Sequence, residues 1–466
     1  MRRARPFALL LLLGLLTAST SSTSAAPPEP FRFAVPIVAA ADETGFPLKD
    51  GDIWVMAGDS ITAQHLHSNY FEAFCYARYP KLKFAFRNSG VGGHTIPTTL
   101  ARFDYDIAAW KPTVVSVELG MNDSGGTKTN DFIKNMGTMT ERIRKIGARP
   151  IIFAASPVND GTTSDKLAGR NQRLDEYATA LKGFSEKEMI PYADQFHALL
   201  DIWGKNKPRE KLLSTIVELK AAAADDSIAG VEGLRAFLAA QEKNPAKGVN
   251  LTGDPVHPGV PGQLMMAAAL LKDLKADGFV SSATVDAEAG KAEAKGCGIT
   301  DVKAENGGVA FDRLDERLPF PIPDDARVAL SIAPDVLALS EYTLKVTGLK
   351  DGDYMLKIGS AGAGRFSAKE LAAGINLTSL APVAMSKDVN PIILQMRGVL
   401  KAVSDKEGVV GTWRALSQKA HAKGADATLM ADLAALTKKV EDADAKIRDA
   451  AKPQKLHFEI SPVPAK

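Results

Sequence analysis

The 466-residue chain carries 57 basic and 55 acidic residues, so its formal net charge is only +2. This near balance excludes the strongly basic surface with which nucleic-acid-binding proteins hold a phosphate backbone. A charged content of 24% and a hydrophobic content of 45% are typical of a soluble globular protein. The chain is too long for one ordinary hydrophobic core, and we expect two or three domains.

The first residues have the composition of an export signal. Arg2, Arg3 and Arg5 precede an apolar run at 7–16, and small residues at 24–26 follow a stretch rich in serine and threonine. These features predict a signal peptide over residues 1–26 and export to the periplasm or the extracellular space. The apolar run is shorter than the roughly 20 residues that span a bilayer, so no integral membrane segment is expected after cleavage.

Residues 30–278 alternate short apolar runs with helical patterns. Five runs are predicted to be strands, at 53–57, 84–86, 113–119, 150–155 and 190–192. Strands that are apolar on both faces and alternate with helices predict an α/β domain with a parallel sheet covered by helices on each side. In such sheets, ligands bind at the carboxyl ends of the strands.

An Ala-rich helical insertion is expected at 205–248, either as a packed hairpin or as a cap that shapes the substrate site. A helix predicted at 262–274 follows it and closes the domain near residue 278. Residues 280–296 are small and polar, and we expect a linker or a loosely held surface segment there.

The remainder of the chain divides into a small β-rich module at 296–380 and a helical segment at 389–466. In the module, period-two alternation at 342–349 and 354–358 predicts a β-hairpin, and further strands are expected at 309–311 and 327–332. The helical segment has a charged, solvated stretch at 441–452. It ends in a possible strand at 456–460.

Cys75 and Cys297 are the two cysteines of the chain. In an oxidising compartment they could form a disulfide, or they could remain two buried thiols. With either outcome, the fold does not depend on a disulfide framework.

Four short segments carry the residue types that one acyl-transfer site needs. Gly58-Asp59-Ser60 offers a hydroxyl at the end of a strand, and residues 88–95 form a glycine-rich turn after the next strand. Residues 120–123 offer a side-chain amide, and residues 254–257 offer an imidazole with a carboxylate three positions earlier. The first three segments each follow a predicted strand and are therefore expected at one edge of the sheet, and the fourth supplies the partner side chains for the same site.

The chemistry suggested by these segments is that of a serine hydrolase. Ser60 is a weak nucleophile unless a base such as His257 takes its proton, and Asp254 would hold the other nitrogen of that ring. The main-chain amides of Ser60 and Gly93 and the side chain of Asn122 would form an oxyanion hole, each donor contributing about 3 kcal/mol. Taken alone, Ser60 could equally be the N-cap of a helix.

The four segments resemble the blocks of the SGNH (GDSL-type) hydrolase family, which occur in this order. Gly58-Asp59-Ser60 matches the first block, with Ile61 in place of the leucine that gives the family its name. Asn88 to Thr95 matches the second block and places the oxyanion glycine of the family on Gly93. His94 follows that glycine, where an acidic residue is common. Residues 120–123 and 254–257 match the third and fourth blocks, and the resemblance covers about residues 50–275.

This resemblance implies a three-layer α/β/α fold, no metal and no cofactor, and hydrolysis of esters or thioesters through an acyl-enzyme. Ser60, His257 and Asp254 would be catalytic, and Ser60, Gly93 and Asn122 would form the oxyanion hole. The predicted export and the appended β-rich module favour a small acyl ester, acetyl above all, on a carbohydrate as the substrate. The alternatives are a lipid, aryl-ester or thioester hydrolase of the same family, or a catalytically idle protein that binds carbohydrate or the cell envelope.

Other motifs favour competing interpretations less well. His65 and His67 have the spacing of a zinc site, but no further ligand is evident, and we expect them at the surface or on the rim of a pocket. Residues 90–93 lack the full dinucleotide-binding fingerprint. Thr62 stands where the second glycine of the α/β-hydrolase nucleophile elbow would be, which disfavours that fold.

Overall fold

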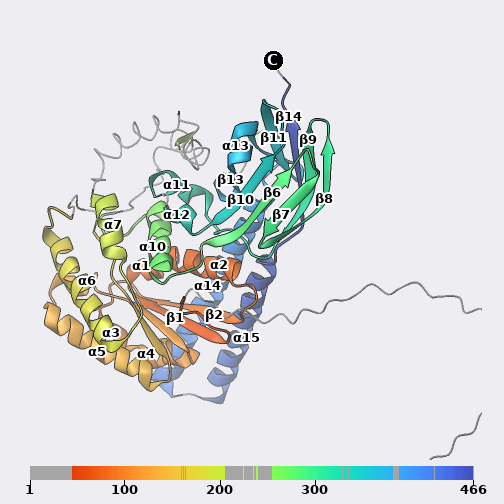
Figure 1. Ribbon diagram of the computed structural model, residues 1–466. Coiled ribbons are helices and arrows are strands. Elements are labelled where there is room, and N and C mark those ends of the chain that lie inside the picture. The colour runs from red at the N-terminus through yellow and green to blue at the C-terminus, as the bar shows by residue number, and fades with distance from the viewer. Residues whose placement is uncertain are drawn as a thin grey trace, which may run out of the picture. The chain divides into compact units, whose positions relative to one another are not determined.

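The computed structural model in Figure 1 describes residues 45–204 and 254–464, except positions 159, 161, 163, 328, 334, 381–387 and 425, together with positions 224, 235, 238 and 239. The expected signal peptide at 1–26 and nearly all of the expected insertion at 205–248 lie outside the described residues. The described residues all belong to one compact unit.

A five-stranded parallel sheet with the strand order β2-β1-β3-β4-β5 is the centre of the α/β part. Its strands are β1 (Asp52–Gly58), β2 (Phe84–Gly90), β3 (Val114–Glu118), β4 (Arg149–Phe153) and β5 (Tyr192–Ala193). The register places Gly58 opposite Gly90 on one side and Glu118 on the other. The segments after these three strands therefore leave the sheet at the same edge, as the sequence predicts.

Helices cover both faces of this sheet. The apolar side chains of α2 (His67–Arg78), α7 (Gln195–Gly204) and α10 (Val260–Asp273) share a core with Trp54, Met56 and Phe86. On the other face, a second core contains Val55, Val115 and residues of four helices, which are α3 (Ile96–Ala101), α4 (Phe103–Asp106), α5 (Thr129–Lys145) and α6 (Gly169–Glu188). Alternate residues of β1 thus face opposite cores, which is the pattern of a strand covered on both sides. The expected three-layer α/β/α fold is confirmed.

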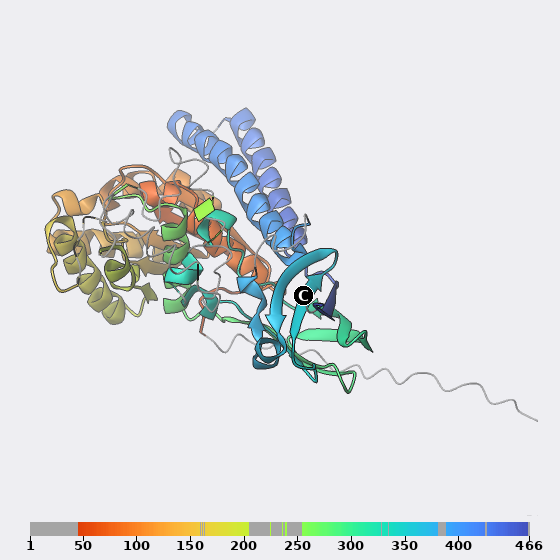
Figure 2. The same cartoon turned by 90° about the horizontal axis from the view of Figure 1, so that it is seen from above.

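Two long helices close the β2 edge of the sheet. They are α14 (Pro391–Lys423) and α15 (Ala427–Ala450), which lie side by side in Figures 1 and 2. Their basic side chains donate to main-chain oxygens along β2: Arg448 to Phe84 at 3.0 Å, Lys406 to Phe86 at 3.0 Å, and Arg414 to Gly90 at 3.1 Å. An edge strand with unpaired carbonyls can pair with a strand of another chain. Here the side chains of the two helices donate to these carbonyls from within the same chain.

The C-terminal β-rich region contains two sheets around one core. One has the order β13-β10-β6-β7 and the other has the order β12-β11-β14-β9-β8. The strands are β6 (Phe279–Asp286), β7 (Lys291–Lys295), β8 (Cys297–Glu305), β9 (Gly308–Asp315), β10 (Glu341–Thr347), β11 (Asp353–Ile358), β12 (Ala361–Ser367), β13 (Ile375–Asn376) and β14 (Leu456–Pro462). Short helices interrupt them at α11 (Ala329–Ile332), α12 (Asp335–Ala338) and α13 (Ala368–Ala373).

Several sequence predictions for this region are confirmed and several are wrong. Strands β9 and β14 and the long helices lie where the sequence predicts them. The expected linker at 280–296 is instead β6 and β7, and the expected strand at 327–332 contains α11. The expected hairpin does not form, because β10 pairs with β6 in one sheet while β11 pairs with β12 and β14 in the other. Period-two alternation identified both strands but carries no information about their partners.

Candidate active site

Ser60 lies at the turn between the end of β1 and the short helix α1 (Ser60–Ala63). The turn is tight, because a Cβ on Gly58 would come within 1.9 Å of Oγ1 of Thr62. The N-cap of α1 is Asp59, whose Oδ1 accepts from the main-chain N–H of Ile61 at 2.9 Å. The capping role proposed above for Ser60 therefore belongs to Asp59, and the Ser60 hydroxyl is available for other contacts.

A chain of hydrogen bonds runs from Ser60 to Asp254. Nε2 of His257 lies 2.8 Å from Oγ of Ser60, and Nδ1 of His257 lies 2.9 Å from Oδ2 of Asp254. The other oxygen of Asp254 accepts from the main-chain N–H groups of Val256 and His257, at 2.8 Å each. Partial burial opposes ionisation of this carboxyl, but these hydrogen bonds outweigh it and lower its pKa. Because an ionised Asp254 only accepts, Nδ1 carries the proton and Nε2 presents a lone pair to the serine hydroxyl.

The loop after β2 approaches Ser60 from another side. A Cβ on Gly92 would lie 4.0 Å from Cβ of Ser60, and Gly93 has φ +74°, a left-handed conformation that favours glycine. Nδ2 of Asn122, in the loop after β3, donates to the main-chain oxygen of His94 at 3.0 Å and lies 3.5 Å from Oδ2 of Asp59. The structure thus links Asn122 both to the loop that carries Gly93 and to the turn that carries Ser60.

Asn88, the first residue of the second motif, holds this arrangement together. Its Nδ2 donates to the main-chain oxygen of Thr62 at 2.7 Å and to Oγ of Ser68 at 2.9 Å, while its Oδ1 accepts from Gly90 at 2.8 Å. The side chain is buried. Asn88 therefore joins the end of β2 to the helix that carries Ser60.

A buried charged cluster lies behind the Gly93 loop. Arg102 forms an ion pair with Asp106, donates to Oγ of Ser89 at 2.8 Å and donates through Nε to Nδ1 of His94 at 3.2 Å. Arg414 of α14 pairs with the same Asp106, Nε to Oδ1, at 2.6 Å. No local sequence pattern indicates the role of Arg414, because it lies 308 residues from its partner Asp106.

The charges of this cluster affect the pKa and the protonation of the His94 side chain. Partial burial and the nearby positive charge of Arg102 lower the pKa of His94. Since the Arg102 N–H can only donate, Nδ1 of His94 accepts and the proton of the neutral ring lies on Nε2. The His94 side chain is half-buried.

Asp59 is the titratable group closest to Ser60 in sequence. Burial raises its pKa to about 7, against the hydrogen bond from Ile61, and the negative charge of Glu118 raises it further. Asp59 therefore changes its charge near neutral pH.

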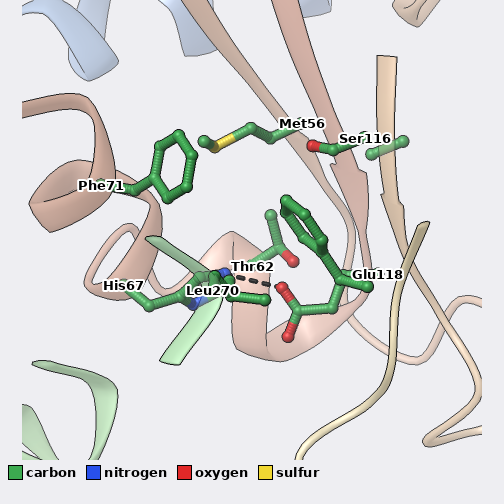
Figure 3. Close-up of a pocket in the computed structure, with 9 residues that line it drawn as sticks. Met56, Thr62, His67, Phe71, Ser116, Glu118 and Leu270 are labelled. Atoms are coloured by element: carbon green, nitrogen blue, oxygen red, sulfur yellow. Dashed lines mark ion pairs between the residues drawn. The ribbon is translucent and has the colours of Figure 1, made fainter. Parts of the chain in front are cut away.

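A second buried histidine–carboxylate pair involves Glu118, the last residue of β3. Nε2 of His67 lies 2.8 Å from Oε2 of Glu118, and Figure 3 shows this ion pair beside Thr62 of α1 in a small pocket. Oε1 of Glu118 accepts from Nε2 of Gln195 at 2.9 Å. A charged residue at the end of a buried strand was the one signal in the sequence that could have identified this pair.

The zinc interpretation of His65 and His67 receives no support. Nδ1 of His65 faces Oε2 of Glu407 at 3.2 Å, whereas His67 faces Glu118. The expectation that both histidines lie at the surface or on a pocket rim is wrong for His67, which is 3% exposed. Within the described part of the chain, no group of three or more His, Cys, Asp or Glu side chains could hold a metal ion.

Two further expectations can be compared with the described residues. Cys75 and Cys297 are both free thiols, so of the two possibilities the structure has the unpaired one. Cys75 is buried and Cys297 is partly exposed.

None of the described helices is both long enough and apolar enough to cross a membrane.

Comparison with known proteins agrees with the geometry. Residues 56–263 match the GDSL-like Lipase/Acylhydrolase family. An acetylxylan esterase from Geobacillus stearothermophilus is 25% identical over 133 residues, which are 27% of this chain and 60% of the relative. The solved structure of a gut microbial diltiazem-metabolizing enzyme has a TM-score of 0.66 and 22% identity, and the match covers 90% of this chain and 99% of that one. The overall architecture, including the C-terminal region, is therefore shared with a known structure.

The family match begins inside β1 and ends inside α10, so it contains all four motifs and the sheet edge where they meet. The resemblance seen in the sequence is thereby confirmed for this segment, which is similar to the SGNH (GDSL-type) family of esterases.

Proposed function

We propose that the protein is an exported serine esterase that hydrolyses small acyl esters, acetyl above all, on a carbohydrate. The observation that carries the proposal is the hydrogen-bonded chain from Ser60 through His257 to Asp254 at the carboxyl edge of the sheet. It supplies a nucleophile, a base and a group that orients the base, which acyl transfer requires.

In the first half of the reaction, Oγ of Ser60 attacks the carbonyl carbon of the ester while Nε2 of His257 takes the serine proton. Asp254 stabilises the resulting imidazolium. The negative charge on the carbonyl oxygen is held by the main-chain N–H groups of Ser60 and Gly93 and by Nδ2 of Asn122. The bond to the leaving alcohol then breaks, and that alcohol leaves with the proton from His257. The acyl group remains as an ester on Ser60.

In the second half, water replaces the alcohol. His257 takes one proton from the water, whose oxygen attacks the acyl carbon, and the same charge is held by the same donors. The bond to Oγ then breaks, His257 returns the proton to Ser60, and the carboxylic acid leaves. Each cycle consumes one ester and one water and restores the enzyme.

The choice of an acetylated carbohydrate rests on two supports. One is the similarity to an acetylxylan esterase, although the matched segment spans only 60% of that relative. The other is the composition of residues 1–26, which predicts export to a compartment where polysaccharides occur. A lipid, aryl-ester or thioester substrate is the alternative within the family. A catalytically idle binding protein is disfavoured by the intact Ser60–His257–Asp254 chain.

A release assay tests the proposal. Wild type and Ser60→Ala are compared on 4-nitrophenyl esters of two, four and eight carbons and on acetylated xylooligosaccharides. We expect wild type to release acetate from both substrate types and Ser60→Ala to be about 10⁴-fold slower or worse. Equal rates in the two proteins would overturn the mechanism. Hydrolysis of the eight-carbon aryl ester without any acetate release from the oligosaccharide would overturn the carbohydrate assignment only.

A further inference from the structure

Gln263, on the first turns of α10, touches three segments that meet at the proposed site. Its Nε2 donates to the main-chain oxygen of Pro258 at 3.2 Å and also donates to Oε1 of Gln64. Its Oε1 accepts from the main-chain N–H of His67 at 3.0 Å and lies 3.1 Å from Nδ1 of the same residue. Gln263 itself is completely buried.

Two of these contacts link the nucleophile to its base. Gln64 is the C-cap of α1, the helix that begins with Ser60. Pro258 directly follows His257. A single amide group therefore bridges the element that carries the hydroxyl and the loop that carries the imidazole.

The orientation of this amide is fixed from both ends. A main-chain N–H, here that of His67, can only donate, and a main-chain carbonyl, here that of Pro258, can only accept. Turning the Gln263 amide over would oppose donor to donor at His67 and acceptor to acceptor at Pro258. Because Oε1 thus faces Nδ1 of His67, that nitrogen carries a proton.

His67 is held in turn by Glu118. Burial disfavours the charged imidazole, but the charge of Glu118 and the hydrogen bond to it more than compensate, so the pKa of His67 is raised. Glu118 is itself bound by Gln195 and belongs to the sheet. A continuous buried network therefore extends from β3 through His67 and Gln263 to the loop of His257.

The loop needs such support because it is poorly buried. The side chains of His257 and Asp254 are 30% and 59% exposed. A base on an exposed loop loses alignment unless its main chain is anchored, and a displacement of 1 Å can cost about 10²-fold in rate.

We propose that Gln263 is a positioning residue for the esterase reaction, fixing the separation of Ser60 and His257 by holding Gln64 and Pro258 with one amide. The inference rests on the proposed function, since it assigns Gln263 to the same reaction.

The test uses two isosteric variants in the full-length protein. Gln263→Glu keeps two oxygens that can accept from His67 but cannot donate to Pro258 or Gln64 while ionised. Gln263→Met keeps the volume and removes every polar contact. The matched control is Ser116→Ala, which is buried, lines the pocket shown in Figure 3 and accepts from Nε1 of Trp54. The measurements are kcat and KM for 4-nitrophenyl acetate, the rate and final extent of Ser60 labelling by a fluorophosphonate, and the unfolding temperature.

In both Gln263 variants we expect kcat and the labelling rate to fall at least tenfold, while KM stays within twofold of wild type and the final labelling is complete. In the control Ser116→Ala we expect kcat within twofold of wild type. Full labelling at a slow rate separates misalignment from a loss of folded protein. Rates within twofold of wild type in Gln263→Glu would overturn the role of Gln263 but not the proposed esterase activity. If Gln263→Met does not fold, the result for Gln263→Glu alone decides. A wild-type protein that neither hydrolyses the ester nor reacts with the fluorophosphonate would overturn the proposed function and this role with it.

Discussion

Nζ of Lys406 on α14 lies 2.6 Å from both carboxylate oxygens of Glu72 on α2, and both side chains are buried. Lys406 also contacts Oε1 of Glu407 at 3.1 Å. The ammonium group of Lys406 therefore pairs with two buried carboxylates and donates to a main-chain oxygen at the edge of the sheet, on β2. The long C-terminal helices are consequently part of the hydrolase core and do not form a separate module.

Replacement of Lys406 tests this conclusion. Lys406→Met leaves Glu72 without its counter-charge in the interior, and we expect a loss of about 3–5 kcal/mol in the free energy of unfolding. Lys401→Met, one and a half turns earlier on the same helix and paired with Asp405 at the surface, should cost less than about 0.5 kcal/mol. Urea unfolding measures both. Similar values for the two variants would show that the buried charges find other partners.

Removal of the Asn122 amide tests the oxyanion hole. In Asn122→Ala we expect kcat on 4-nitrophenyl acetate to fall by about 10²- to 10³-fold, because a donor that acts mainly on the transition state is lost, while KM changes little. Ser124→Ala is the control in the same loop, since its hydroxyl donates only to the main-chain oxygen of Met121 at 2.7 Å. A fall of less than threefold in Asn122→Ala would assign the oxyanion contacts to the main chain alone.

Asp59 is predicted to make stability depend on pH. Its pKa rises from 3.8 in the unfolded chain to about 7 in the folded protein, so the folded state retains a proton that the unfolded state loses. The resulting cost is absent below pH 3.8, grows between pH 3.8 and 7, and is constant above. Asp59→Asn keeps an oxygen that can cap Ile61, and it should stabilise the protein at pH 8 by on the order of 1–4 kcal/mol but have little effect at pH 4. A gain that is equal at both pH values would contradict the assignment.

His197 should make the stability of the folded protein depend on pH in the opposite direction. Its ring lies between Asp194 and Asp175, at 2.7 and 2.8 Å, and the hydrogen bond to Asp194 is the main reason that its pKa is raised to about 9. This stabilisation is complete below pH 6.5 and is lost as the pH rises through 9. Because the ring is 45% exposed, screening limits the effect to less than about 1 kcal/mol. His197→Gln should lower the unfolding temperature at pH 6 and leave it nearly unchanged at pH 10. An equal fall in the unfolding temperature at both pH values would show that protonated His197 does not stabilise the folded protein.

The sequence was sufficient to predict the parallel sheet and the position of the four motifs. Its strands are short apolar runs, and parallel topology then forces residues such as Ser60 and Asn122 to one edge. The sequence also predicted which positions would supply an imidazole and a carboxylate, because Asp254 and His257 lie in one local turn. These are all local patterns combined with one topological rule.

Interactions between distant segments could not be predicted in the same way. Asp444 lies in a stretch that reads as solvated, yet it forms a buried pair with Arg87 of β2 at 2.7 Å. Nothing within ten residues of Asp444 indicates this partner. Gln263 likewise reads as an ordinary polar residue of an amphipathic helix, and its contacts exist only after three segments have assembled.

Strand β14 lies in the middle of its sheet, between β11 and β9, although α14 and α15 separate it in the chain from all the other strands. During synthesis, the sheet would remain split into two halves until residues 456–462 leave the ribosome. A stop codon within the helical pair would therefore remove the strand that joins these halves, and would expose two strand edges at once. The C-terminal region is therefore not a detachable unit, since its strands enclose in sequence two helices that share their cores with the α/β part.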